Sequence, residues 1–129
     1  MVKVLIVDDS KYVRFTLRAM LENKNFEVVG EAKDKIEAIE KFKETKPDVI
    51  LMDLRMPEEG DVAEVAMSGI SATEEIKKLN PEVKIIALTA AAQEKYKELV
   101  MNAGADGYIT KPYKKDEIIK AIEEALAKK

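Results

Sequence analysis

The chain has 129 residues, the usual size of one domain, of which 47% are hydrophobic and 36% charged. Its formal charge of −3, with both signs interspersed, argues against a nucleic-acid surface. The sequence contains no Cys and no His, which excludes disulfides, thiolate or imidazole metal ligands, Ser-His-Asp triads and phosphohistidine. Any chemistry must therefore come from carboxylates, lysine, hydroxyl groups and the backbone.

Five short apolar runs predict β-strands. In chain order they are Val2–Val7, Glu27–Ala32, Val49–Asp53, Lys84–Thr89 and Gly107–Lys111. Near-continuous apolar runs are typical of parallel strands that are buried on both faces. The second run is more polar than the others, which favours an edge position.

Apolar residues at helical spacing fill the segments between these runs. The expected core faces are Val13, Leu17, Met20 and Leu21; Ile36, Ile39 and Phe42; Tyr96, Leu99, Val100 and Ala103; and Ile118, Ile122, Ala125 and Leu126. Gly104 stands where a helix would end.

Strand and helix alternate five times along the chain, which predicts an α/β fold. The expected architecture is a doubly wound, five-stranded parallel sheet of order 2-1-3-4-5 with five helices, as in flavodoxin-like proteins. We expect one domain over residues 1–129. No apolar run is long enough to cross a bilayer, and no targeting segment is visible. We therefore expect a cytoplasmic location and no insertion into a membrane.

Polar side chains stand at the carboxyl ends of the predicted strands, where open α/β sheets bind their ligands. Asp8 and Asp9 follow the first strand, and Asp53 ends the third. Thr89 ends the fourth and Lys111 the fifth. Three carboxylates on one rim repel one another unless a cation or a shifted pKa relieves them. Hard oxygen ligands of this kind favour Mg²⁺.

A carboxylate such as Asp53 can attack a phosphoryl group when a metal ion neutralises the developing charge. Lys111 would then supply a positive charge to the phosphate oxygens, and Thr89 a hydroxyl donor. Taken alone, Asp8-Asp9-Ser10 would be interpreted as a helix N-cap, and Lys111 as a solvated lysine. Their joint placement favours a phosphoryl-transfer site.

These residues resemble the signature of response-regulator receiver domains. The resemblance rests on four motifs that match in order and spacing: Asp8-Asp9-Ser10, Asp53-Leu54-Arg55-Met56-Pro57, Thr89-Ala90 and Tyr108-Ile109-Thr110-Lys111-Pro112. Together they cover nearly the whole chain. Because no output domain is seen in the sequence, the chain is most similar to the single-domain chemotaxis regulators of this family.

The resemblance implies a role for each matching position. Asp53 would be the phosphoacceptor, and Asp8 and Asp9 the metal-binding acids, joined by the backbone carbonyl of Arg55. Thr89 and Tyr108 would be the switch residues. Lys111 would contact the phosphoryl oxygens, with a peptide bond to Pro112 that is often cis in the family.

The resemblance also implies the partners. A histidine kinase of the chemotaxis type would donate the phosphoryl group. A downstream protein would bind the face built from residues 96–103, 107–111 and 118–126. We therefore expect a Mg²⁺-dependent signalling switch, rather than an enzyme with a separate substrate.

One segment departs from the family pattern, because residues 59–66 intervene between Met56-Pro57-Glu58 and Met67-Ser68-Gly69. We interpret this segment as a tolerated insertion in the loop after the third strand, since lengthening a loop costs little entropy. The sharper alternative is an acidic lid or specificity element, in which Glu58, Glu59, Asp61 and Glu64 add negative charge near the site. In that alternative, a short helical turn packs on the domain through Val62, Val65 and Met67. An engineered graft would look the same.

Other functions remain open at this stage. A phosphorelay carrier would use the same residues. A flavin or nucleotide carrier needs a phosphate-binding loop after the first strand, where this chain is acidic and lacks Gly. A phosphohydrolase would need a second acid at position 55, which is Arg. A phosphorylation-dead scaffold is disfavoured, because every reactive residue of the motif is present.

Overall fold

The computed structural model describes residues 1–22, 25–54, 62–90 and 94–128, and for residues 62–68, 90 and 94–95 it describes the backbone alone. The elements alternate along the chain as β1 (Val2–Val7), α1 (Lys11–Leu21), β2 (Phe26–Ala32), α2 (Lys35–Thr45), β3 (Val49–Leu54), α3 (Val62–Leu79), β4 (Lys84–Ala90), α4 (Glu94–Asn102), β5 (Gly107–Lys111) and α5 (Lys115–Ala127). The five predicted strands are confirmed, with bounds that differ by at most one residue.

The five strands form one parallel sheet in the order β2-β1-β3-β4-β5, as predicted. All six residues of β3 are buried, which matches its continuous apolar sequence. β2 lies at an edge and keeps partly exposed residues along its middle. The chain order reverses between β1 and β3, so a switch point lies between these two strands.

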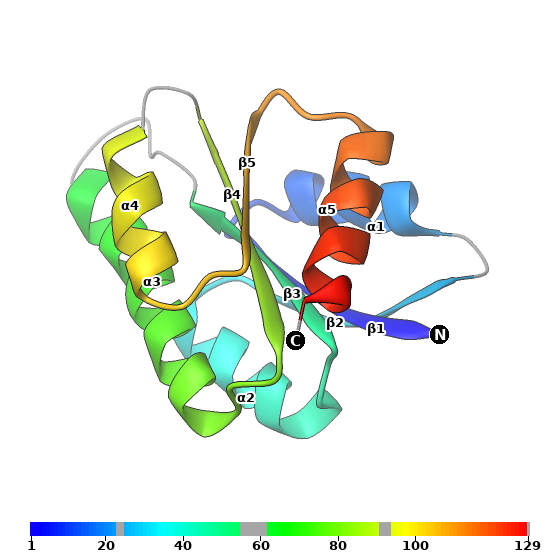
Figure 1. Ribbon diagram of the computed structural model, residues 1–129, viewed down its shortest axis with the longest axis horizontal. Helices are drawn as coiled ribbons and strands as arrows, with labels where there is room; N and C mark the ends of the chain where they lie inside the picture. Colours follow the sequence, from blue (N-terminus) through cyan, green and yellow to red (C-terminus); the bar gives the residue numbers. More distant parts are fainter. Residues whose placement is uncertain (23–24, 55–61, 91–93, 129) are drawn as a thin grey trace.

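The helices cover both faces of the sheet (Figure 1). On one face, α2, α3 and α4 pack on a core that includes Phe42, Ile76 and Val100. On the other face, α1 and α5 bury Leu17 and Ile122. The sheet therefore separates two hydrophobic cores, as a doubly wound fold requires.

Three residues expected in the core are exposed instead. Ile36 is 70% exposed, and Leu99 and Leu126 are 46% and 38% exposed. In α2 the buried residues are Ala38 and Phe42. At 100° per residue, Ile36 stands about 120° around the helix from Phe42, outside the buried stripe. The prediction of these three as core residues was wrong, because Ile36 stands outside the buried stripe of its helix and Leu99 and Leu126 stand at the margins of theirs.

Two helix ends follow the local sequence. Ser10 caps α1 by accepting a hydrogen bond from the amide of Val13 at 3.3 Å. After α4, Gly104 adopts a φ of 118° and its amide donates to Met101, while the amide of Ala105 donates to Val100. This is the Schellman arrangement that a glycine at C′ permits, and it confirms the expected helix end.

The segment expected to be a loop insertion, residues 59–66, reaches into α3. Because α3 begins at Val62, residues 62–66 are helical rather than part of a loop. Residues 59–61 lie outside the described residues. Residues 62–66 therefore form the N-terminal part of the helix that follows the third strand.

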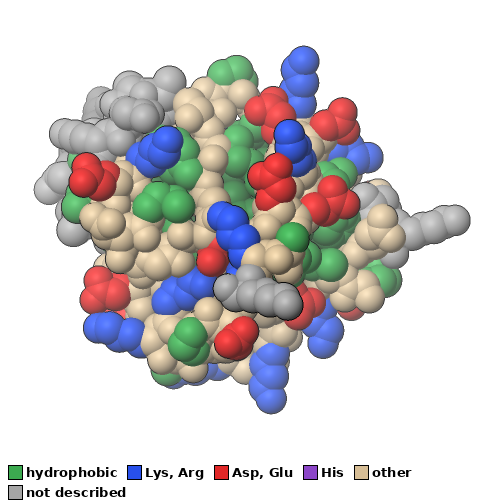
Figure 2. Space-filling model, viewed as in Figure 1, with side chains coloured by type: hydrophobic (Ala, Val, Ile, Leu, Met, Phe, Trp, Pro, Cys, Tyr) green, Lys and Arg blue, Asp and Glu red, His purple; other side chains and the backbone are tan. Residues whose placement is uncertain are grey.

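Charged side chains of both signs are interspersed on the face seen in Figure 2. They are not gathered into a patch of one sign there, in line with the small net charge. In the described part of the chain, no helix has the length and apolar character that crossing a membrane requires.

Candidate functional site at the carboxyl edge of the sheet

Asp8 and Asp53 meet at the switch point because β1 and β3 pair in register. Val7, the last residue of β1, lies opposite Met52 in β3, so the residues that follow them, Asp8 and Asp53, are neighbours. Both are buried, with 2% and 9% of their surface exposed. Buried acids are rare unless they are paired or bind a cation, so this pair marks a candidate site.

Hydrogen bonds hold Asp8 in place. Its amide donates to the carbonyl of Ala32 at the end of β2, at 2.9 Å. One carboxylate oxygen, Oδ1, accepts the amide of Ser10 at 2.6 Å. The other oxygen, Oδ2, is buried and has no hydrogen-bond partner among the described residues.

Asp53 is bound by Lys111, which reaches across β4 from β5. Lys111 Nζ lies 2.7 Å from Asp53 Oδ1, and the Asp53 side chain is fully buried. Asp53 Oδ2, like Asp8 Oδ2, finds no hydrogen-bond partner in the described part of the chain. The peptide bond between Lys111 and Pro112 is cis, as the family resemblance implied.

The electrostatics of the site follow from burial and from the two neighbouring acids. Burial and, next in size, the nearby Asp53 carboxylate together raise the pKa of Asp8 to about 8, against the opposing effects of the Ser10 amide and Lys111. Burial also raises the pKa of Tyr113 above its usual value, with added contributions from the charges of Asp53 and Asp8. The pocket therefore disfavours a second negative charge unless a cation is present.

The four remaining predicted site residues lie in different surroundings. Thr89 is fully buried on β4, one residue beyond Leu88, the register partner of Asp53. Tyr108 is partly buried on β5, with Lys97 Nζ 5.2 Å from its ring centroid. Asp9 is exposed, and Arg55 lies outside the described residues.

A hollow of about 220 Å³ opens beside the two acids. Lys33, from the turn after β2, and Lys35, the first residue of α2, help to line it. Sequence reasoning missed these lysines and Tyr113. The rule that ligands bind at the carboxyl ends of strands applies to β2 as well, and Tyr113 stands two residues beyond Lys111, so both signals were present.

The two buried acids fit a hard divalent cation. Asp8 Oδ2 and Asp53 Oδ2 are carboxylate oxygens without hydrogen bonds in the described structure, and such buried orphans call for an explanation. Mg²⁺ commonly takes one or two carboxylates and fills its other positions with water and phosphate oxygens. No group of three or more acidic side chains surrounds a common point within the described ranges, so this chain offers a two-carboxylate arrangement there.

The sequence compares closely with one family. The profile of the response regulator receiver domain matches residues 4–123, and the chain belongs to this family. The chemotaxis protein CheY of Halobacterium salinarum is 42% identical over 124 residues, which cover 96% of this chain and 96% of that protein.

Solved structures agree with this assignment. The response regulator domain of Thermotoga maritima CheB has a TM-score of 0.83 and 32% identity, over 100% of this chain and 98% of that one. A chain of the CheX–CheY–BeF₃–Mg²⁺ complex of Borrelia burgdorferi has a TM-score of 0.83 and 25% identity, with coverages of 98% and 90%. The protein is therefore a receiver domain of two-component signalling.

Proposed function

We propose that this receiver domain is a Mg²⁺-dependent chemotaxis-type switch that accepts a phosphoryl group on Asp53 from a histidine kinase. The observation that carries the proposal is the buried pair of carboxylate oxygens without hydrogen bonds, Asp8 Oδ2 and Asp53 Oδ2, with Lys111 bound to the second acid. The CheY relative, itself named a chemotaxis protein, supports the type of pathway.

The chain's own residues divide the chemistry between them. The Asp53 carboxylate forms a bond to phosphorus while the bond from phosphorus to the donor's imidazole nitrogen breaks, and the donor leaves with that electron pair. Lys111 moves from the carboxylate to the phosphoryl oxygens, and Thr89 donates its hydroxyl to them. A bound Mg²⁺ supplies charge neutralisation between the acids and the phosphoryl oxygens.

Asp8, Asp9, Asp53 and the backbone carbonyl of Arg55 are the proposed cation ligands. Burial and the tie to Ser10 keep Asp8 in place for this role. Asp9 is exposed, so it acts on the cation from the solvent side, which suits a ligand that binds through water. The solved complex with BeF₃ and Mg²⁺ supports the choice of metal.

Phosphorylation acts on a downstream protein by changing the surface to which that protein binds. On phosphorylation, the Thr89 side chain moves toward the phosphoryl group, and the Tyr108 side chain then turns inward. A downstream protein binds the α4-β5-α5 face in this phosphorylated state. Tyr108 and Lys97 belong to that face and already contact each other. We further propose that the protein acts in the cytoplasm, and that its phosphoryl chemistry is limited to its own phosphorylation and dephosphorylation.

We treat residues 1–129 as one receiver domain and residues 59–66 as an extra segment. The helical start of α3 at Val62 supports a tolerated extension of that helix. If the segment were an acidic lid, deleting residues 59–66 would speed phosphorylation by a small anionic donor. If it is only tolerated, the deletion leaves that rate unchanged.

Intact-protein mass after incubation with acetyl phosphate tests the proposal. We expect one added phosphoryl group in the wild type, lost in Asp53→Asn and lost when Mg²⁺ is withheld. Asp116→Asn is the matched control, because it makes the same chemical change on the exposed surface of α5. Modification of Asp53→Asn, or modification without any divalent cation, contradicts the proposal.

A further inference from the structure

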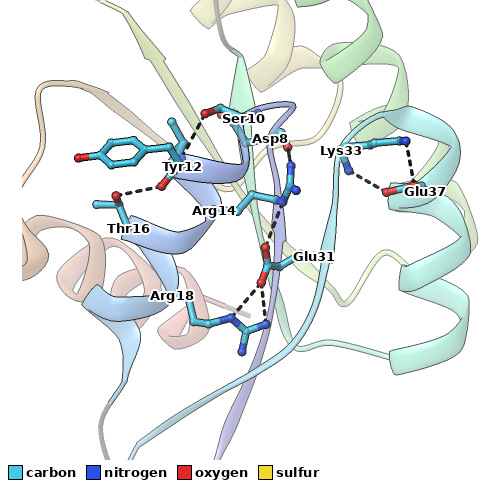
Figure 3. Close-up of polar contacts among 10 residues, drawn as sticks. Asp8, Ser10, Tyr12, Arg14, Thr16, Arg18, Glu31, Lys33 and Glu37 are labelled. Atoms are coloured by element: carbon cyan, nitrogen blue, oxygen red, sulfur yellow. Dashed lines mark hydrogen bonds and ion pairs between the residues drawn. The ribbon is translucent and has the colours of Figure 1, made fainter.

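Three charged side chains form a cluster behind Asp8 (Figure 3). Arg14 Nε donates to Glu31 Oε1 at 3.0 Å, and Arg18 Nε donates to Glu31 Oε2 at 2.9 Å. Arg14 also uses a second nitrogen, Nη1, to donate to the backbone carbonyl of Asp8 at 2.7 Å. The cluster thus joins α1 and β2 to the segment that carries the acidic pair.

Arg14 is well placed to hold this contact. Its side chain is only 15% exposed, and its planar guanidinium presents several donors in a rigid fork. Glu31 directs one edge of the fork, which leaves another nitrogen for Asp8. Burial acts to raise the pKa of Glu31, but the hydrogen bonds and charges of Arg18 and Arg14 outweigh it and hold this pKa below its usual value. Glu31 therefore stays ionised.

The Asp8 segment is thereby bound from three sides. β2 accepts its amide, the start of α1 donates to its carboxylate, and Arg14 donates to its carbonyl. These bonds orient the peptide plane from which the Asp8 side chain and the following Asp9 depart. A carboxylate ligand must be oriented closely for Mg²⁺, which demands near-ideal geometry.

We propose that Arg14, oriented by Glu31, is a positioning residue for the divalent-cation site. It acts by fixing the backbone of Asp8, and it does not touch the cation or the phosphoryl group. This inference rests on the proposed function, because it requires that Asp8 and Asp53 bind Mg²⁺.

The sign of the expected effect separates positioning from simple electrostatics. Removing the positive charge of Arg14 makes the surroundings of the acids more negative, and Coulomb's law then predicts tighter binding of Mg²⁺. Loss of positioning predicts weaker binding. The two explanations therefore predict changes of opposite direction in the same measurement.

Arg18 offers a matched control. It binds the same carboxylate of Glu31, with Nη2 2.8 Å from Oε2, and it carries the same charge on the same helix. The backbone carbonyl of Asp8 accepts its hydrogen bond from Arg14 Nη1, whereas Arg18 directs its Nε and Nη2 to Glu31. Arg18→Met therefore removes an equal charge and an equal bond to Glu31, but leaves Asp8 held.

The test is a Mg²⁺ titration of the full chain without a phosphodonor. Binding is measured by calorimetry and by the NMR shifts of the Ser10 and Asp53 amides. Replacing an outer residue that orients a metal ligand typically weakens affinity by about 10- to 100-fold, so we expect a loss of about 10-fold for Arg14→Met. We expect a change of less than about 2-fold for Arg18→Met. In the metal-free protein, the Ser10 amide should exchange faster in Arg14→Met and remain unchanged in Arg18→Met.

A second pair of variants covers the case in which Arg14→Met fails to fold. Arg14→Lys and Arg18→Lys keep both charges, but a lysine lacks the rigid fork that serves Glu31 and Asp8 together. We expect weaker Mg²⁺ binding in Arg14→Lys alone. Circular dichroism verifies that each variant is folded before titration.

Several results would overturn the inference. If Arg14→Met binds Mg²⁺ as tightly as the wild type, or more tightly, the cluster does not position the site. Equal losses in the Arg14 and Arg18 variants would mean that the cluster only stabilises the fold. If the wild type itself binds no Mg²⁺, the proposed function fails and this inference fails with it.

Discussion

Replacing Asp8 by Asn should stabilise the metal-free protein at alkaline pH. Asn keeps the Oδ1 acceptor that Asp8 offers to the amide of Ser10, so the local hydrogen bond survives. The substitution removes the buried negative charge beside Asp53. It therefore tests the cost of the charge with little change in shape.

The size of the effect follows from the pKa of Asp8. A rise from 3.8 to about 8 corresponds to at most roughly 6 kcal/mol at about 1.4 kcal/mol per pKa unit. Relaxation of the protein and entry of water lower the cost of burying a charge, and the amide group of the new Asn must also find hydrogen-bond partners. We therefore expect Asp8→Asn to add about 2–3 kcal/mol to the free energy of unfolding above pH 8.

The pH dependence has a definite sign. Because the folded-state pKa is raised, the folded protein binds more protons than the unfolded chain between about pH 4 and pH 8. The contribution of Asp8 to stability is therefore neutral below this window and becomes increasingly unfavourable as pH rises through it. In Asp8→Asn this part of the pH dependence disappears.

Urea unfolding in EDTA, monitored by circular dichroism near pH 4 and near pH 9, measures the difference in stability between the two proteins. We expect similar stabilities at the lower pH and a more stable variant at the higher one. Asp116→Asn, on the exposed surface, should show no such difference. Adding Mg²⁺ at pH 9 should stabilise the wild type more than the variant, because the ion binds only the folded site.

The reasoning is refuted if Asp8→Asn is less stable than the wild type near pH 9. It is also refuted if the difference between the two proteins is the same at both pH values. Either result would mean that the buried carboxylate is ionised in the folded protein without a cost, for instance because its Oδ2 atom is well solvated.

Three further substitutions have expected outcomes, the third as the control for the second. Lys111→Met removes the ammonium 2.7 Å from Asp53, and should lower stability in EDTA at pH 8 by about 3 kcal/mol and slow phosphorylation by acetyl phosphate. Unchanged stability in urea would show that the ion pair is dispensable. Gly69→Ala places a methyl group against the Leu54 side chain beneath the site and should cost about 1–3 kcal/mol, whereas Gly107→Ala, with 3.4 Å of clearance, should cost less. Equal urea midpoints for the two glycine variants would contradict this.

Much of the fold was predictable because it depends on local patterns. Continuous apolar runs identified the strands, and the alternation of elements with right-handed crossovers left few sheet orders. The carboxyl ends of those strands then placed Asp8, Asp53 and Lys111 on one edge, where the structure brings them together. These predictions needed only the positions of residues along their own elements.

What failed, or was missed, depends on three-dimensional contacts. The exposure of Ile36 reflects where the apolar stripe of α2 meets the sheet, which periodicity alone did not resolve. The bond between Arg14 and Glu31 joins residues 17 positions apart on different elements, and neither residue looks unusual in sequence. The start of α3 at Val62 was anticipated only as a short helical turn in the alternative interpretation, because the departure from the family pattern was interpreted first as a loop.

The division of the core by the sheet has a consequence for how the sequence can drift. Phe42 and Ile76 pack on one side of the sheet, and Leu17 and Ile122 pack on the other. A side chain that changes volume in one layer therefore does not contact the helix side chains of the other layer. Substitutions in different layers should therefore combine additively, and compensating pairs should arise within a layer. The helices that flank the two acids can then diverge independently, while the edge where Asp8 meets Asp53 must stay compatible with both.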